Sequence, residues 1–139
     1  MKTVLLDTGV IVALLDRSER FHPTCAEAVG ALKLPLITCE AVIAESCYLL
    51  RNLRGASERI LENVSAGIFQ IPFHLPTSAR EVQTRMRQYR DRGIDFADAC
   101  PIALASELGT GDILTLDRDF LIYRWGRRNL FRPLISLVQ

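Results

Sequence analysis

The strongest constraint on the fold is an unbroken apolar run near the start of the chain that ends in an acid. Residues 3–6 read Thr-Val-Leu-Leu, and Asp7, Thr8 and Gly9 follow before a second apolar run begins. An apolar run without alternation predicts a strand that is buried on both faces, as in parallel sheets. Asp7 would then lie at the carboxyl end of a parallel strand, where open α/β sheets bind ligands.

Segments typical of strands and of helices alternate along the rest of the chain. The predicted strands cover 3–6, 35–38, 68–71 and 112–117, with a last short strand around Leu134 and Ile135. The predicted helices cover 9–15, 23–32, 41–50, 57–66, 76–89 and 96–108. This alternation predicts βαβ units, and therefore a parallel sheet with helices on both of its faces.

Length and composition narrow the class of protein. The chain has 139 residues, of which 49% are hydrophobic and 24% charged, as expected of one soluble globular domain over residues 1–139. No apolar run approaches the roughly 20 residues that span a membrane, and we expect no signal peptide. The cysteines lack C-x-x-C spacing, which argues against a zinc ribbon and favours small core residues in a reducing cytosol. They are Cys25, Cys39, Cys47 and Cys100.

Four acids lie in apolar surroundings. Asp7 and Asp117 each end an apolar strand, Glu45 is in the middle of an apolar helix, and Asp98 is near the start of another. An unpaired buried carboxylate costs several kcal/mol, so each of these acids needs a cation, a set of hydrogen bonds or a proton. If they converge, a divalent cation would offset both burial and repulsion. Oxygen ligands without a nearby His or Cys cluster favour Mg²⁺ or Mn²⁺ over zinc.

Each acid also has a purely structural interpretation. Asp7 could cap the helix that follows it, and Asp98 could be a helix-start residue stabilised by the helix dipole. Glu45 could pair with an arginine, and Asp117 could be an ordinary residue of a strand-to-helix turn. Three further acids are interpreted as caps or surface residues, with the last of them a reserve metal ligand: Asp95, Asp112 and Asp119.

Taken in order, these stretches resemble the PIN-domain ribonucleases, and especially the toxin subunits of VapBC-type toxin–antitoxin pairs. The resemblance begins with Leu6-Asp7-Thr8 and with Glu45 in the helix after the second strand. It continues in Asp-Phe-Ala-Asp-Ala at 95–99, before an apolar helix, and in Leu-Thr-Leu-Asp-Arg-Asp-Phe at 114–120. It therefore extends from residue 3 to about residue 120.

The resemblance implies a three-layer α/β/α fold with a central parallel sheet of about five strands. It also implies a Mg²⁺- or Mn²⁺-dependent endoribonuclease that hydrolyses RNA phosphodiester bonds and leaves 5′-phosphate and 3′-hydroxyl ends. A cytoplasmic homodimer restrained by a small antitoxin protein is implied as well. Carried over to this chain, Asp7 and Asp98 would bind the metal directly, and Glu45 and Asp117 would act through water or on a second ion. Thr8 and Thr115 would hold the acids by hydrogen bonds.

Arginines dominate the positive charge. Among 17 basic residues only Lys2 and Lys33 are lysines, and arginine suits bidentate phosphate contacts. The candidate RNA-binding residues are Arg118, Arg124, Arg127 and Arg128, near Arg132 and interleaved with Tyr123 and Trp125. The alternative is a solvated basic segment with Trp125 in the core or in a dimer contact.

The helix predicted at 76–89 is amphipathic. Its apolar stripe consists of Ala79, Val82, Met86 and Tyr89, and its surface face is interpreted to carry Arg85, Arg87 and Arg90.

Pro101 departs from the family pattern. If its helix begins at Asp98, Pro101 falls in the first turn at little cost, which is the case we expect. If the helix begins near Asp95, Pro101 removes a backbone hydrogen bond close to Asp98.

The competing function is a catalytically degraded PIN domain that binds RNA or a protein without cleaving RNA. Leu6-Asp7-Thr8-Gly9 also matches the aspartic-protease signature, but the helical pattern excludes that nearly all-β fold.

Overall fold

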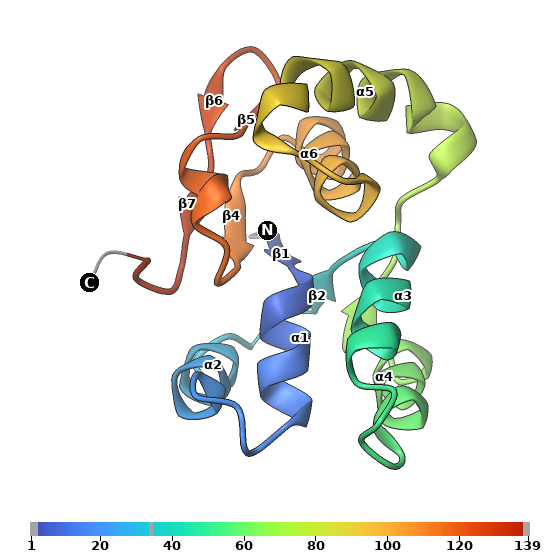
Figure 1. Cartoon of the computed structure of the whole chain (residues 1–139), viewed down its shortest axis with the longest axis vertical. Coiled ribbons are helices and arrows are strands. Elements are labelled where there is room, and N and C mark those ends of the chain that lie inside the picture. The colour runs from blue at the N-terminus through green and yellow to red at the C-terminus, as the bar shows by residue number, and fades with distance from the viewer. Residues whose placement is uncertain (1–2, 34, 138–139) are drawn as a thin grey trace.

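A computed structural model describes residues 3–33 and 35–137 as alternating strands and helices (Figure 1). The sheet strands are β1 (Val4–Leu6), β2 (Leu36–Ile37), β3 (Phe69–Gln70), β4 (Asp112–Leu114) and β7 (Arg132–Pro133). The helices are α1 (Thr8–Leu15), α2 (His22–Gly30), α3 (Glu40–Leu49), α4 (Ala56–Ser65), α5 (Leu75–Gln88) and α6 (Phe96–Leu108). Short 3₁₀ turns η1 (Arg90–Arg92) and η2 (Arg118–Leu121) and a hairpin of β5 (Arg124–Trp125) and β6 (Asn129–Leu130) complete the described elements.

The sheet has five strands in the order β3-β2-β1-β4-β7, and every pairing in it is parallel. Leu5 of β1 is in register with Ile37 on one side and Ile113 on the other. β1 lies in the centre with all three of its residues buried, which is why its sequence is an unbroken apolar run. In the part of the chain that the structure describes, six helices flank the sheet, and the predicted α/β fold is confirmed.

All six predicted helices form, and their ends agree with the predicted ends to within two residues. α6 agrees at both ends, with Asp95 before it and Gly109 after it in the left-handed region (φ 70°). Within residues 3–33 and 35–137, no helix is both long and apolar enough to cross a bilayer. Cys25, Cys39 and Cys100 are buried, as expected of core residues, and Cys47 is half-buried.

The prediction of the last strand was wrong by two residues. The strand is β7 at Arg132–Pro133 and not the segment around Leu134 and Ile135. Arg132 N donates to Gly111 O at 2.7 Å and Leu134 N donates to Ile113 O at 2.9 Å. The N–H groups of Arg132 and Leu134 point toward β4, so an N–H group at position 133, between them, would point away from β4. Because β7 is an edge strand, the missing N–H of Pro133 costs the sheet no hydrogen bond between strands. The antiparallel β5–β6 hairpin was not predicted.

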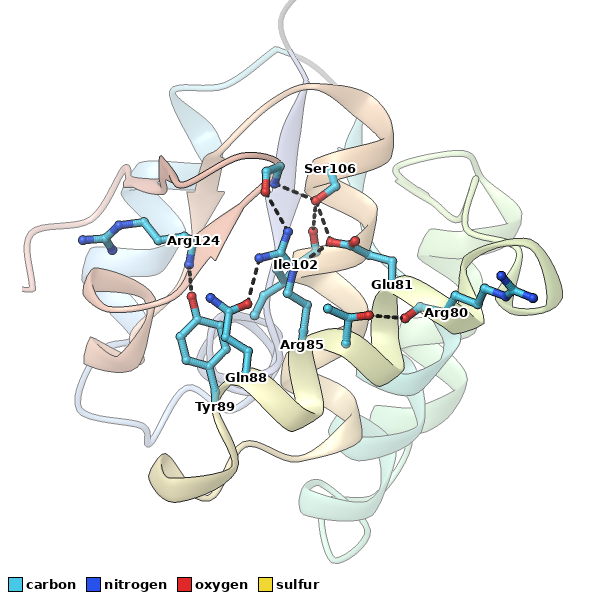
Figure 2. Close-up of polar contacts among 10 residues, drawn as sticks. Arg80, Glu81, Arg85, Gln88, Tyr89, Ile102, Ser106 and Arg124 are labelled. Carbon is cyan, nitrogen blue, oxygen red and sulfur yellow. Dashed lines mark hydrogen bonds and ion pairs between the residues drawn. The ribbon is translucent and has the colours of Figure 1, made fainter.

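The interpretation of Arg85 as a surface residue was also wrong. Its side chain is buried, and its guanidinium donates to Glu81 at 2.7 Å, to Gln88 at 3.0 Å and to Gly126 O at 2.9 Å. Ser106 of α6 donates to Glu81 at 3.0 Å and accepts from Gly126 N at 2.8 Å. Figure 2 shows this network, which joins α5, α6 and the start of the hairpin turn. In the predicted apolar stripe of α5, Val82 and Tyr89 are buried, Met86 is half-buried and Ala79 is exposed.

Candidate active site

Asp7 follows β1 directly and lies at the carboxyl end of the central strands. It is 5% exposed and occupies the residue before α1, but its side chain makes no capping hydrogen bond, which argues against the capping interpretation. Instead, Asp7 Oδ2 accepts a hydrogen bond of 2.7 Å from Thr115 Oγ1, one residue after β4. The predicted support of Asp7 by Thr115 is therefore present as a contact between the ends of neighbouring parallel strands.

The structure brings all four predicted acids to one cavity of about 380 Å³. Asp7 and Asp117 reach it from the ends of β1 and β4, half-buried Glu45 from the middle of α3, and half-buried Asp98 from the first turn of α6. The remaining lining residues are Thr8, Gly9, Leu49, Asp95 and Leu116. Acids separated by up to 110 positions in the sequence thus share one concave surface, because the parallel sheet aligns the carboxyl ends of its strands.

The pKa values of three of these acids are raised. Burial raises the pKa of Asp7 to about 6, although hydrogen bonds from Thr115 and the Thr8 backbone oppose the rise. Burial, followed by the charges of Asp95 and Asp7, raises the pKa of Asp98 to about 8. Burial also raises the pKa of Asp117 above its ordinary value. For these three acids the cost of burial outweighs the favourable contacts, which is typical of sites that take a cation or a proton.

Among the described residues, no basic side chain forms an ion pair with any of the four acids. The nearby Arg92 pairs with Asp119 at 3.0 Å. The arginine partner suggested for Glu45 is thus absent from the described part of the chain. In the same ranges, Thr8 Oγ1 is buried without a hydrogen-bond partner beside the acids. No three His, Cys, Asp or Glu side chains among the described residues stand close enough to hold one metal ion as they are arranged.

Two of the neighbouring acids act as caps. Asp95 Oδ1 accepts from the Asp98 backbone N–H at 2.9 Å and so caps α6, as predicted. Asp117 Oδ1 accepts from the Asp119 N–H at 2.9 Å, which fits the turn interpretation of Asp117, while the same residue also lines the cavity. α6 begins at Phe96, as the predicted range of 96–108 has it, and not at Asp98, so the expectation that Pro101 falls in the first turn was wrong and Pro101 lies inside the helix.

Tyr123 is a residue of the site that the sequence analysis assigned elsewhere. It was placed among the aromatic residues of an RNA track, but its ring is fully buried between Tyr89 and Phe120. Its hydroxyl donates to Asp98 Oδ2 at 3.4 Å. No local pattern points to this contact, since it joins residues 25 positions apart through the packing of the segment after η2 against α6.

The predicted RNA-binding arginines do not gather at the acids. Arg118 is exposed in η2, directly after Asp117. Arg124 donates to the carbonyls of residues 121, 122 and 123 at 3.2, 2.7 and 3.1 Å. Arg127 and Arg128 are exposed at the hairpin turn, whose Gly126 is bonded to Ser106, two helical turns beyond Asp98. Trp125 is half-buried against the core, and its indole N–H donates to Leu130 O at 3.0 Å.

Comparison with known proteins identifies the family. The PIN domain family matches residues 4–125, which include all four acids of the cavity. The chain belongs to the PIN domain family. The resemblance to PIN-domain ribonucleases is therefore confirmed, and PIN-domain ribonucleases are generally dependent on divalent metal ions.

Two mycobacterial proteins illustrate the similarity. The chain is 27% identical over 117 residues to Ribonuclease VapC26 of Mycobacterium tuberculosis, a match that covers 83% of this chain and 87% of the relative. Its fold matches the crystal structure of VapC20 from the same organism, described as a sarcin–ricin loop cleaving toxin, with a TM-score of 0.77. That match covers 84% of this chain and 92% of VapC20 at 17% sequence identity.

Proposed function

We propose that this PIN-domain protein is a metal-dependent endoribonuclease that acts as a toxin restrained by a cognate antitoxin. The observation that carries the proposal is the convergence of Asp7, Glu45, Asp98 and Asp117 on one cavity without any basic partner among the described residues. Its relationship to Ribonuclease VapC26 supports the same activity.

The residues of the cavity fit a hard divalent cation. Carboxylates are the ligands that Mg²⁺ and Mn²⁺ prefer, and the unpartnered Thr8 hydroxyl adds a neutral oxygen beside them. Asp7 and Asp98 would hold the ion, and Glu45 and Asp117 would bind through water or hold a second one. When bound, the metal lowers the pKa of a water ligand and neutralises charge on the reacting phosphate. Because no three His, Cys, Asp or Glu side chains of the described residues stand close enough to hold one ion, the acids would have to move closer together to bind it.

The protein's own groups would prepare this site. The Thr115 hydroxyl fixes one oxygen of Asp7, and the Tyr123 hydroxyl does the same for Asp98. Both contacts limit the rotamers of the ligand before binding, which is how outer hydrogen bonds tune metal sites. The exposed Arg118 stands next to Asp117 and is the member of the predicted arginine set best placed to contact a phosphate near the cavity.

A protein partner is part of the proposal. Tyr48 and Leu49 of α3 are 62% and 54% exposed, and Leu49 also lines the acid cavity. Large apolar side chains beside a polar site favour a covering protein, as expected of a small antitoxin. We propose further that the chain acts in the cytoplasm as a homodimer. Purification of the chain from its native host should yield a stable complex with a short protein partner that does not cleave RNA, whereas a chain that purifies alone and is harmless to cells contradicts the toxin assignment.

The nuclease assignment is tested by incubating the purified chain with a mixed RNA pool in Mg²⁺, in Mn²⁺ and in EDTA. We expect internal cleavage with either metal and none in EDTA, with products that carry 5′-phosphate and 3′-hydroxyl ends. Saturable RNA binding without cleavage in either metal would instead favour the degraded PIN domain that only binds.

A further inference from the structure

A second cavity, of about 450 Å³, lies where the end of α1 meets the connection between α3 and α4. It is lined by residues 15–18 at and after the end of α1, by residues 53–56 before and at the start of α4, and by Arg59. Figure 1 shows the lower ends of α1 and α3 side by side in this part of the molecule. The sequence analysis assigned no role to any residue of this cavity.

The cavity carries three arginines against one acid. Arg17, Arg54 and Arg59 line it, are exposed, and have no ion pair within residues 3–33 and 35–137. The acid is Asp16, whose Oδ1 already accepts hydrogen bonds from Ser18 N at 3.0 Å and Ser18 Oγ at 2.6 Å. Three arginines that line one concave surface and form no ion pair within the described residues leave a positive charge for a ligand to neutralise.

The start of α4 adds to this charge. Ala56 begins the ten-residue helix and lines the cavity, and no side chain caps the helix at Gly55. The amino end of a helix carries a partial positive charge and unsatisfied N–H groups, which favour anions. The three arginines carry the assignment of an anion site, and the helix end strengthens it.

The cavity lined by the three arginines, here called the arginine cavity, lies beyond the acid cavity along the same two helices, α1 and α3. α1 begins in the acid cavity at Thr8 and ends in the arginine cavity at Leu15. In the same way, Leu49 at the end of α3 lines the acid cavity, and Leu53, four residues later, lines the arginine cavity. Eight helical residues rise about 12 Å. A stacked nucleic-acid strand covers that length with about three to four nucleotides at roughly 3.4 Å each.

We propose that Arg17, Arg54 and Arg59 bind a backbone phosphate of the substrate RNA, a few nucleotides from the phosphodiester at the acid cavity. The assignment rests on the proposed nuclease function. It favours RNA over an acidic protein segment because the two cavities lie along one helix pair, so one strand can occupy both. Positive charge at this distance also offsets the repulsion between RNA and the acid cluster.

The test compares two double variants in RNA binding. R54Q/R59Q removes two of the guanidinium groups, and R80Q/R87Q is the matched control, because Arg80 and Arg87 are exposed on α5. Both carry D98N, so that a fluorescein-labelled 12-nucleotide single-stranded RNA stays intact while its polarisation is measured in Mg²⁺. Circular dichroism and thermal melting verify that all variants fold.

We expect the Kd of R54Q/R59Q to rise at least tenfold and that of the control to change less than twofold. The slope of log K against log salt should fall by about 0.7 for each phosphate that the variant no longer neutralises. In the chain that retains Asp98, R54Q/R59Q should raise KM for the same RNA about tenfold and leave kcat within twofold, since these residues bind substrate away from the reacting phosphate.

Two results would overturn the proposal. One is equal RNA affinity and salt slope for R54Q/R59Q and its control. The other is unchanged RNA affinity together with a failure to bind a 12-residue polyglutamate peptide that the wild type binds, which would assign the arginines to an acidic protein segment. The test also distinguishes this proposal from the nuclease assignment. A chain that does not cleave RNA, but whose RNA binding depends on Arg54 and Arg59, would refute the nuclease assignment and still support the phosphate contact.

Discussion

Replacing Asp98 by asparagine should stabilise the metal-free protein while abolishing its activity. Asp98 is desolvated and faces Asp95, Asp7, Asp117 and Glu45. Its pKa is raised from 3.8 to about 8, which at about 1.36 kcal/mol per pKa unit corresponds to at most about 6 kcal/mol. Because Asp98 is only half-buried, solvent screens much of this repulsion, and we expect D98N to raise the free energy of unfolding by about 2 kcal/mol at pH 8.

The same argument fixes the direction of the pH dependence. An acid whose pKa is higher in the folded chain than in the unfolded chain binds its proton more tightly when folded. In EDTA, the free energy of unfolding of the wild type should therefore fall as the pH rises from about 4 to about 8. Asp7, with a pKa of about 6, contributes to the lower part of this range, and Asp98 to all of it. D98N should lose most of the decline above pH 6.

Urea unfolding followed by circular dichroism in EDTA at several pH values measures both effects. D119N is the matched control: Asp119, the reserve ligand of the sequence prediction, is not among the residues that line the acid cavity and is paired with Arg92, so its loss should leave stability unchanged or lower it by up to about 1 kcal/mol. Mn²⁺ should stabilise the wild type more than D98N, since only the wild type retains the full set of acids. A D98N protein less stable than the wild type at pH 8, or a wild type whose metal-free stability rises between pH 5 and 8, would refute this account.

Three further substitutions test the support of the fold and site. T115V removes the hydroxyl that holds Asp7 and should weaken Mn²⁺ binding, measured by calorimetry, by about 10- to 100-fold. T110V is the control, and an unchanged affinity of T115V for Mn²⁺ would contradict the positioning role of Thr115. R85M leaves Glu81 without its ion pair and should cost about 2–3 kcal/mol in urea unfolding, an effect that E81Q should reduce if the pair is the cause. G111A would bring its Cβ into Trp125 and within 2.8 Å of Leu130 O, so it should lower the melting temperature by several degrees, unlike G30A, where the Cβ meets nothing within 4 Å.

The sequence predicts most of the fold because local signals and topology agree. The apolar runs before Asp7 and Asp117 are strands of one parallel sheet, and that topology alone brings both acids to one edge. The start of α6 could also be predicted from the sequence, since Asp95 caps this helix, as expected of an acid directly before a helix. The convergence of Asp7 and Asp117 therefore follows from the order of the strands, whereas Glu45 and Asp98 reach the same cavity through the packing of α3 and α6 on the sheet.

Features that depend on contacts between residues far apart in the sequence could not be predicted from the sequence. Arg85 looks like a surface residue on its helix, but Gly126, 41 positions later, covers it and accepts its hydrogen bond. Tyr123 looks like a surface aromatic residue in a basic segment, but it packs under Asp98. Pro133 argues against a strand unless the strand is known to lie at the sheet edge, as β7 does.

The most direct test of the central claim is the rate of RNA cleavage by the wild type, D98N and D119N during a Mn²⁺ titration. If the acid cluster holds the catalytic metal, the wild type and D119N should cleave with a saturable Mn²⁺ dependence, and folded D98N should lose activity by at least a hundredfold. Equal cleavage by the wild type and D98N, or cleavage by the wild type that persists in EDTA, would contradict the claim.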